Sequence, residues 1–304
     1  MEDLEKIERQ FDTKELEQYS RDLEVMSQYD KEDRVISSVE AQELAEADRK
    51  IPSIKTNIDE IDNLLGGLRA GQLVVLSSPT GQGKTSFCQT LTSRFAKQNI
   101  NTLWFSYEVG IAEFLEKFEN NPLFYLPKEL KQNSIKWLEH RILESIAKYD
   151  CKIVFIDHLH YLLEMQQMAE ARSISLLIGM MVRELKKIAI KHGVIIFLVA
   201  HMRKLQYDKM PEIDDLRDSS FVGQEADIVM FLKRKYEGKG EQQVATNQAL
   251  LSIAKNRRTG NLGYVKLEMV GKEFVTITNN YDKNKSDNIP EESRDRQENL
   301  GYGI

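Results

Sequence analysis

The stretch from Leu73 to Cys88 constrains the fold of this chain more than any other, because it joins a strand, a tight loop and a helix start. Residues 73–76 form a short apolar run, which is typical of a buried parallel strand. The loop and the start of the predicted helix consist of Ser78, Pro79, Thr80, Gly81, Gln82, Gly83, Lys84, Thr85 and Ser86. A strand, a glycine-rich loop and a helix in this order predict a P-loop.

A P-loop binds phosphate through its backbone N–H groups and the N-terminus of the helix that follows. Lys84 is placed to reach the β- and γ-phosphates of a nucleotide, and Thr85 is placed to hold Mg²⁺. Ser78 stands where the pattern G-x-x-x-x-G-K-T usually has its first glycine. A glycine-rich turn that contains Gly-Lys-Thr by chance is the alternative, and the strand before and helix after it argue against that alternative.

The chain has 304 residues, enough for one large α/β domain with appendages. It contains no run of 18 apolar residues, so the sequence predicts no membrane span. The two cysteines, Cys88 and Cys151, lie beside apolar runs, which suggests a reducing compartment without disulfides. We therefore expect a cytoplasmic protein, with the nucleoid or a virus-infected cytoplasm as specific possibilities.

The net charge of −6 is unevenly distributed along the chain. Residues 1–50 carry a net −8 and residues 281–304 a net −2, which leaves +4 for residues 51–280. A mildly positive middle between acidic ends permits nucleic-acid binding but does not require it.

The composition predicts three parts. Residues 1–50 form an acidic helical extension or linker, in which Leu16, Tyr19, Leu23 and Met26 follow a narrow helical stripe. Such helices bury little alone, so they pack on the core or on a neighbouring subunit; a loosely ordered tail is the alternative. Residues 51–278 form the globular domain, and the polar residues 279–304 a disordered tail.

Within the globular domain, strands and helices alternate. Strands are predicted at 102–107, 152–157, 194–200, 226–232, 249–254 and 264–269, with a closing hairpin at 274–278. Residues 111–149 are predicted mainly helical with a break at 120–122, a further helix spans 174–192, and 203–218 is a long polar loop. This alternation predicts the α/β class, with a mainly parallel central sheet flanked by helices.

Polar residues end three of the apolar strands. Because ligands bind beyond the carboxyl ends of parallel strands, Glu108, Asp157 and His201 should gather around the nucleotide. Asp157 fits a carboxylate that holds Mg²⁺ through water, Glu108 is placed to activate a water, and His201 is placed to sense the γ-phosphate. Solvated strand ends and a loop histidine are the plainer alternatives.

Lys255 and Arg257 belong to a basic cluster that closes a late strand. Such a cluster can be a solvated surface, or it can supply an arginine finger that reaches the phosphates of a neighbouring subunit. The spacing alone does not decide between these two interpretations.

Six motifs in order make a specific resemblance, which covers residues 51–278. They are SPTGQGKTS, WFSYE, IVFIDHLHYL, FLVAHMRK, DLRDSSFVGQEADIVMFLKR and AKNRRTGNLG. Together they resemble the RecA-like P-loop NTPase motor of the hexameric replicative DNA helicases, including the DnaB type, Twinkle and the phage primase-helicases. The resemblance implies ATP hydrolysis coupled to translocation on single-stranded DNA and duplex unwinding, with ATP and Mg²⁺ as cofactors, a homo-hexamer, and a loader or primase as partner.

The resemblance also implies roles for single residues. Gly83, Lys84 and Thr85 bind phosphate and Mg²⁺, Glu108 is the catalytic base, Asp157 the Walker B acid and His201 the γ-phosphate sensor. Lys255 and Arg257 act in trans on the next subunit's nucleotide, and Gln224 belongs to the fourth motif of the nucleotide site. The loops at 164–172 and 203–218 grip DNA, with Arg203, Lys204 and Lys209 as phosphate contacts.

The sequence departs from the family pattern in three ways, and these departures are the reason for considering other functions. Only residues 1–50 precede the motor, Ser78 replaces a glycine, and the segment from Glu108 to Asp157 is short beside the DnaB type. ATP turnover is therefore better supported than processive unwinding. The alternatives are a RecA-fold ATPase of another class, either a recombinase-like filament former or a clock-type switch, and a helicase loader that binds ATP without useful turnover.

Overall fold

The computed structural model describes residues 13–31, 33–49, 52–107, 109–130, 135–158, 174–202, 210–216, 219–238 and 244–277. The chain divides into two compact units, Met1–Pro52 and Ser53–Ile304. The predicted tail at 279–304 lies outside the described residues, and the predicted domain boundaries stay predictions.

The first unit is helical where it is described. It contains α2 (Thr13–Ser27) and α3 (Ser38–Arg49). The side-chain oxygen of Ser37 accepts a hydrogen bond from the backbone N–H of Glu40 at 3.1 Å, which satisfies one of the free donors at the start of α3. The predicted stripe on α2 is exposed along its whole length, at Leu16, Tyr19, Leu23 and Met26.

Among the described residues of the second unit, one sheet of eight strands forms the centre, in the order β2-β3-β4-β1-β5-β6-β7-β8. The strands are β1 (Leu73–Ser78), β2 (Thr102–Ser106), β3 (Ile153–Asp157), β4 (Ile195–His201), β5 (Ile228–Glu237), β6 (Val244–Asn256), β7 (Gly263–Val270) and β8 (Glu273–Thr276). The pairs from β2 through β5 are parallel, and those from β5 through β8 are antiparallel. The predicted α/β fold with a mainly parallel sheet is confirmed.

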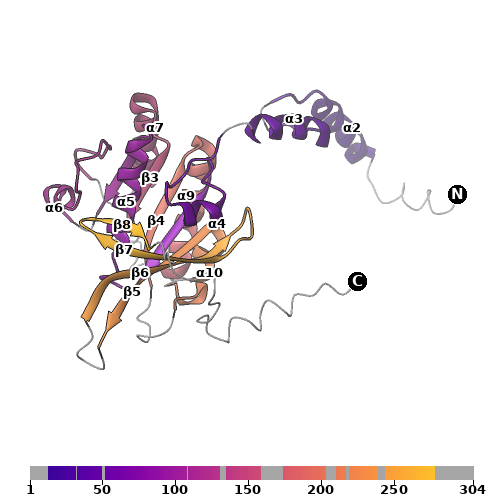
Figure 1. Ribbon diagram of the computed structural model, residues 1–304. Coiled ribbons are helices and arrows are strands. Elements are labelled where there is room, and N and C mark those ends of the chain that lie inside the picture. Colours follow the sequence, from indigo (N-terminus) through magenta and orange to yellow (C-terminus); the bar gives the residue numbers. More distant parts are fainter. Residues whose placement is uncertain are drawn as a thin grey trace, which may run out of the picture. The chain divides into compact units, whose positions relative to one another are not determined.

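Helices cover both faces of this sheet (Figure 1). The helices are α4 (Asp59–Leu65), α5 (Lys84–Lys97), α6 (Ile111–Glu116), α7 (Ile135–Tyr149), α9 (Ile174–His192) and α10 (Ser219–Glu225), with a short 3-10 turn, η2 (Ile213–Asp215). Leu73 and Val75 of β1 belong to one core with α7, α9 and α10, whereas Val74 and Leu76 belong to a second core with α4, α5 and α6. The alternation arises because successive strand side chains point to opposite faces.

Stacked aromatic rings fix the parallel strands of the second core. Trp104 on β2 stacks on Phe155 of β3 with ring centroids 4.6 Å apart, and Phe155 stacks on Phe197 of β4 at 4.9 Å. The indole N–H of Trp104 donates to the hydroxyl of Thr92 on α5 at 2.9 Å, so its polar atom is satisfied inside the core. These contacts hold α5, and with it the loop that precedes α5, against the sheet.

The predicted helical segment between 111 and 149 has helices at both ends, as expected, but its break is longer than the predicted break at 120–122. Residues 117–130 follow α6 without helix, and the backbone of Tyr125 bonds to the edge strand β2, accepting from Trp104 N–H at 2.8 Å and donating to Thr102 O at 2.9 Å. Pro122 and Pro127 have no N–H to continue a helix, so the segment instead covers an edge that would otherwise expose unpaired backbone groups.

Two further elements differ from the prediction. The helix α10 lies directly after the predicted polar loop, and η2 lies within that loop. The hairpin of β5 and β6 is longer than predicted, because apolar runs at 226–232 and 249–254 mark only the buried part of each strand. Beyond it, the mostly polar and less buried residues at 233–237 and 244–248 continue the antiparallel ladder.

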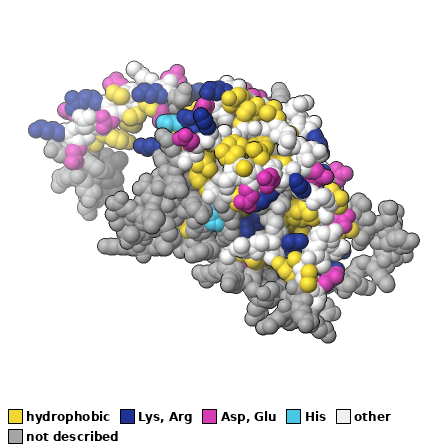
Figure 2. Space-filling model, turned by 90° about the vertical axis from the view of Figure 1, so that its left-hand side faces the viewer, with side chains coloured by type: hydrophobic (Ala, Val, Ile, Leu, Met, Phe, Trp, Pro, Cys, Tyr) yellow, Lys and Arg dark blue, Asp and Glu magenta, His cyan; other side chains and the backbone are white. Residues whose placement is uncertain are grey.

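The described helices include none that is both long and apolar enough to cross a lipid bilayer. Figure 2 shows one side of the molecule, on which basic and acidic side chains are interspersed with hydrophobic patches.

Candidate active site

The P-loop turns at two glycines whose backbone conformation favours glycine. Gly81 has φ of 78° and Gly83 has φ of 93°, and Gly83 is the residue before the first turn of α5. A β-carbon on Gly83 would also lie 3.2 Å from the ring of Phe274. The loop geometry therefore favours glycine at both positions, of which the motif specifies Gly83.

Ser78, which replaces the usual first glycine, stands in a different environment. It is the last residue of β1, it is fully buried, and it pairs with His201 of β4 in the parallel register. Its φ is not positive, and its hydroxyl donates to the carbonyl of Pro79 at 3.0 Å. A serine therefore fits here without backbone strain.

Lys84, Thr85 and Asp157 come together at the carboxyl ends of β1 and β3. The ammonium of Lys84 donates to the carbonyls of Ser78 at 3.0 Å and Pro79 at 3.2 Å, so it folds back over the loop. The hydroxyl of Thr85 donates to Oδ2 of Asp157 at 2.7 Å. Lys84 is 6% exposed and Asp157 is 1% exposed, so both charges lie in a weakly solvated site where electrostatic interactions are strong.

The side-chain oxygens of Thr85 and Asp157 suit Mg²⁺ as metal ligands better than they suit a metal that takes all its ligands from the protein. Mg²⁺ prefers oxygen ligands and is commonly held by one or two protein groups together with substrate phosphates. Across the part of the chain that the structure describes, no group of three or more His, Cys, Asp or Glu side chains could hold a metal by itself. The chemistry of Thr85 and Asp157 therefore matches a metal that arrives with a nucleotide.

Cys88 lies on α5 one turn beyond this pair and is fully buried. Burial, followed by the nearby charge of Asp157, raises the pKa of the Cys88 thiol well above its usual range. The thiol therefore stays protonated at neutral pH and acts as a packing group.

A cleft of about 620 Å³ opens at the P-loop. Lys84, Lys117 and Arg234 contribute positive charge to its lining, against the two carboxylates Glu113 and Asp157. Its apolar lining comes from Val109, Met269 and Phe274. A cleft of this size with clustered cations beside apolar side chains suits a nucleotide, which has both phosphates and a flat base.

Sequence reasoning missed the contribution of β5 to the cleft. The amide oxygen of Gln82 accepts the backbone N–H of Arg234 at 2.7 Å, and its amide nitrogen donates to the hydroxyl of Tyr236 at 2.9 Å. The guanidinium of Arg234 donates to the carbonyl of Thr246 at 2.7 Å. Gln82 thus links the P-loop to the β5–β6 hairpin. The link could not be predicted from the sequence, because it depends on the pairing of β1 with β5, which are far apart in the chain.

Several predicted site residues cannot be placed beside the cleft. Glu108 and the predicted DNA contacts Arg203, Lys204 and Lys209 lie outside the described residues. The backbone of His201 is described, as the last residue of β4 beside Ser78, but its side chain is not. The roles of these residues stay predictions.

Lys255, Arg257 and Gln224 lie at the opposite edge of the sheet from the P-loop. β6 runs antiparallel to β5, and Lys255 pairs with Val229 near the start of β5. The N–H of Asp227 donates to the carbonyl of Leu73, the first residue of β1, at 2.9 Å. β1 spans six residues, or about 20 Å at roughly 3.3 Å per residue, so this amino edge is remote from the carboxyl edge that bears the P-loop.

Both cations at the amino edge contact the end of α10. Lys255 Nζ donates to the carbonyls of Gly223 at 2.7 Å and Gln224 at 3.1 Å, and Arg257 donates to the carbonyl of Gln224 at 2.5 Å. Burial, and then the charge of Arg257, lowers the pKa of Lys255. Within one chain, Gln224 thus lies with Lys255 and Arg257, and not with Lys84 and Asp157.

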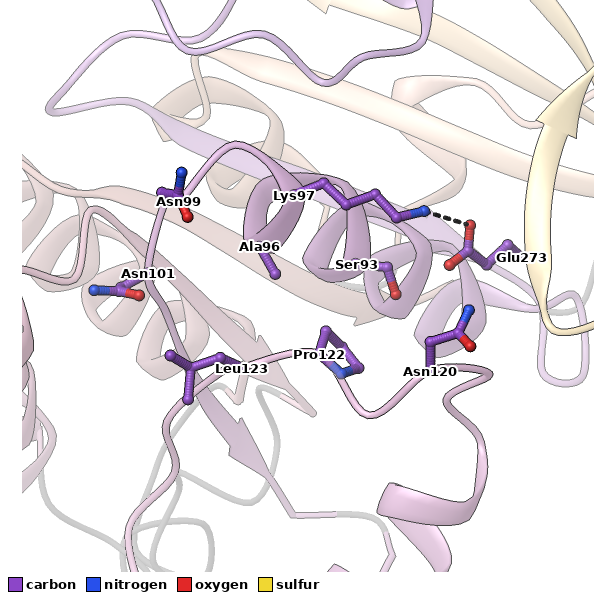
Figure 3. Close-up of a pocket in the computed structure, with 9 residues that line it drawn as sticks. All are labelled: Ser93, Ala96, Lys97, Asn99, Asn101, Asn120, Pro122, Leu123 and Glu273. Atoms are coloured by element: carbon purple, nitrogen blue, oxygen red, sulfur yellow. Dashed lines mark ion pairs between the residues drawn. The ribbon is translucent and has the colours of Figure 1, made fainter.

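A second cavity of about 520 Å³ lies beside the last turn of α5 (Figure 3). Lys97 reaches across it toward Glu273, with 3.9 Å between the charged atoms. Its other lining residues are Ser93, Ala96, Asn99, Asn101, Asn120, Pro122 and Leu123. Of the predicted site residues that the structure describes, none lines this cavity, so the cleft at the P-loop is the candidate active site.

Comparisons with known proteins agree with this geometry. The DnaB-like helicase C terminal domain family matches residues 53–119 and 110–279. The replicative DNA helicase DnaB of Treponema pallidum (strain Nichols) is 23% identical over 243 residues, which cover 71% of this chain and 53% of that protein. The chain thus spans about half the length of the curated relatives that it matches.

Two solved structures share the fold. One is a separate ATPase domain, which superposes with a TM-score of 0.64 at 23% identity, covering 79% of this chain and 96% of that domain. The other, a DnaB-like replicative helicase described with its primase interactions, gives a TM-score of 0.64 at 22% identity and covers 85% of this chain and 71% of that one.

Proposed function

Since the chain belongs to the DnaB-like helicase C-terminal domain family, we propose that it hydrolyses ATP and uses the energy to move along single-stranded DNA and separate a duplex. One observation carries this proposal. The phosphate-binding groups lie at the carboxyl edge of the sheet, whereas Lys255 and Arg257 lie at the amino edge, about 20 Å away by the length of β1.

This separation favours a ring over an isolated ATPase. Phosphoryl transfer needs positive charge close to the transferred group, and an arginine finger supplies it either from the same chain or from a neighbour. Arg257 is too far from its own P-loop to do so, so it acts on the nucleotide of the next copy. Each site is then completed by head-to-tail assembly of copies, and among such assemblies we propose the closed homo-hexamer that the family resemblance implies.

At the carboxyl edge, Gly83, the backbone of the loop and Lys84 would hold the phosphates, and Thr85 and Asp157 would hold Mg²⁺. The metal, when bound, neutralises charge on the phosphate oxygens. The ammonium of Lys84 must exchange the carbonyls of Ser78 and Pro79 for phosphate oxygens, which a flexible lysine side chain can do. Met269, Phe274 and Arg234 provide the apolar and planar surface for the base.

Glu108 is proposed to activate the attacking water and His201 to contact the γ-phosphate. Tyr107 supports the first assignment, because its N–H donates to the carbonyl of Asp157 at 3.2 Å, so the residue before Glu108 in the sequence lies beside Asp157. The parallel pairing of His201 with Ser78 supports the second, because it brings the end of β4 next to the start of the P-loop.

DNA contact is proposed for the loops at 164–172 and 203–218, with Arg203, Lys204 and Lys209 on phosphates. Such contacts grip a strand without reading its sequence. A loader or primase is a proposed partner, because one structural relative is described with its primase interactions.

A strand-displacement assay on forked DNA with Mg²⁺ and ATP tests the proposal. The protein should release the displaced strand, and the Lys84→Ala variant should not. Negative-stain imaging with an ATP analogue should show closed rings. Filaments would favour a recombinase-like ATPase, and monomers that hydrolyse ATP without displacing DNA would favour a switch.

A further inference from the structure

Asp227, between α10 and β5, is the centre of a cluster of charged groups at the amino edge. Its side chain is 10% exposed. Oδ2 accepts the backbone N–H of Leu73 at 2.8 Å and the ammonium of Lys186 at 2.6 Å. Oδ1 faces Arg257 at 3.4 Å. One carboxylate therefore contacts the start of β1, the helix α9 and the proposed arginine finger.

Lys186 supplies the positive charge that compensates the nearly buried carboxylate of Asp227. Its side chain is 16% exposed, and it also donates to the carbonyl of Gly71 at 2.7 Å. A paired and hydrogen-bonded charge is stable in a weakly solvated site, whereas an unpaired one is not. Lys186 thus pairs with one oxygen of the nearly buried Asp227 carboxylate, and the contact with Arg257 lies on the other oxygen.

Arg257 is hydrogen-bonded to its own chain, although half of its side chain is exposed. Its backbone N–H donates to the carbonyl of Asp227 at 2.8 Å, and its guanidinium contacts Asp227 and the carbonyl of Gln224. Even so, its side chain is 52% exposed. Contacts within its own chain therefore anchor the Arg257 side chain, and the rest of the side chain is exposed.

The neighbouring cations show that this arrangement is more than a helix cap. Lys255 already donates to the carbonyls of Gly223 and Gln224 at the end of α10. Arg258, the next residue, directs its guanidinium inward to the carbonyls of Leu65 and Gly67 and supports its own chain. Of these three cations, Arg257 is the one that combines an acidic partner with an exposed guanidinium.

We propose that Asp227 is the positioning residue of Arg257 and holds its guanidinium ready for the nucleotide of the neighbouring copy. The proposal rests on the trans role of Arg257 proposed above. An arginine side chain has many rotamers, and fixing it before the copies meet reduces the entropy lost in the transition state. Asp227 can do this because Leu73 and Lys186 fix the carboxylate itself.

Asp227→Asn is the direct test, with Lys186→Met as its matched control. Both changes break the same ion pair, so both should lower the melting temperature. Only Asp227→Asn removes the charge that faces Arg257. Its kcat for ATP should fall roughly 10- to 100-fold, the scale of a small misplacement of a catalytic group, with KM unchanged. Lys186→Met keeps the carboxylate that faces Arg257 and removes one of the two groups that fix it, so its kcat should fall less than that of Asp227→Asn.

Mixed assemblies distinguish positioning from a general structural role. Asp227→Asn protein has an intact P-loop and a misplaced finger, so mixing it with Lys84→Ala protein should restore activity at some interfaces. Mixing it with Arg257→Ala protein should restore none. In the same chain, adding Asp227→Asn to Arg257→Ala should lower kcat no further.

The double variant Asp227→Asn/Lys186→Met keeps the test valid if Asp227→Asn folds poorly. Removing both charges of a buried pair destabilises less than removing one. The double variant should therefore regain stability and still fail to complement Arg257→Ala.

Two failures are distinguishable. Recovery for Arg257→Ala with Lys84→Ala, but none for a co-assembled Asp227 variant with Lys84→Ala, would overturn the positioning role and leave the trans finger intact. No recovery for Arg257→Ala with Lys84→Ala would overturn the trans finger itself. A wild-type kcat for Asp227→Asn would also overturn the positioning role.

Discussion

The two edges of the parallel sheet handle charge in opposite ways. At the carboxyl edge, Lys84 and Asp157 are almost entirely buried and contact groups of their own chain. At the amino edge, the Arg257 side chain is 52% exposed although its acidic partner Asp227 is nearly buried. The carboxyl edge encloses the charges of Lys84 and Asp157, and the amino edge exposes the charge of Arg257.

This difference teaches how one sheet can serve two nucleotides. Loops after parallel strands form an enclosed cleft at the carboxyl edge, where a ligand replaces the contacts within the chain. An antiparallel strand that returns to the amino edge places a basic cluster where no ligand of the same chain can reach it. If Arg257 acts in trans as proposed, the mixed sheet binds a nucleotide at one edge and supplies a cation to a neighbouring copy from the other.

The largest effect should come from the carboxyl edge. Lys84→Ala should abolish ATP hydrolysis and strongly weaken nucleotide binding, because it removes the buried cation that faces the phosphates. Lys97→Ala is a matched control on the same helix, since Lys97 is 65% exposed and lines the second cavity instead. Turnover of the purified variants and binding of a fluorescent ATP analogue measure both effects, and unchanged turnover in Lys84→Ala would contradict the assignment of the site.

Arg257→Ala should bind ATP normally and hydrolyse it roughly 10³- to 10⁵-fold more slowly, the range known for arginine fingers. Arg258→Ala is the control at the next residue: it should lower the melting temperature, because Arg258 bonds to its own chain, but keep near-normal turnover in the folded fraction. Mixing Arg257→Ala with Lys84→Ala protein should restore part of the activity. Wild-type turnover in Arg257→Ala would leave the amino edge as a solvated basic surface.

Glu108→Gln should retain ATP binding and lose roughly 10²- to 10⁴-fold in turnover, because a carboxamide cannot accept a proton from water. Mixtures of variants test on which edge Glu108 acts. We expect it to act at the same edge of the sheet as Lys84 and at the opposite edge from Arg257. Glu108→Gln should therefore fail to restore activity with Lys84→Ala and succeed with Arg257→Ala. Glu116→Gln, at an exposed residue of α6, serves as control. Loss of nucleotide binding in Glu108→Gln would indicate a structural role instead.

Much of the carboxyl edge was predictable because its signals are local. The tight loop needs positive φ angles, which glycine adopts most readily, so Gly81 and Gly83 mark the loop in the sequence. Asp157 could be assigned to the site because residues that end parallel strands lie at the same edge of the sheet. The apolar runs that begin β1, β3 and β4 mark fully buried strands, which have a strong sequence signal.

The amino edge and the outer hairpin were not predictable in the same way. Asp227 contacts Leu73 and Lys186, and Gln82 contacts Arg234, only because strands far apart in sequence pair in the sheet. The polar ends of β5 and β6 have no buried face to produce an alternating pattern, so an apolar signal misses them. After α6 only a short break at 120–122 was predicted, and the backbone bonds at Tyr125 that draw the longer segment onto β2 are also long-range contacts.

The smallest effect should come from Ser78, the residue that departs from the usual P-loop pattern. Ser78→Gly adds backbone freedom at the end of β1 and removes the hydroxyl bond to Pro79, whose carbonyl still accepts from Lys84. We expect a loss in unfolding free energy below about 1 kcal/mol, with turnover changed less than about threefold. Gly83→Ala is the contrasting exchange in the same loop, because φ of 93° and the Phe274 ring at 3.2 Å both oppose a side chain. Thermal unfolding and steady-state turnover of the two variants should differ clearly. Equal losses would mean that the serine at the end of β1 matters as much as the glycine at position 83, and a gain in stability for Ser78→Gly would mean that serine is strained there.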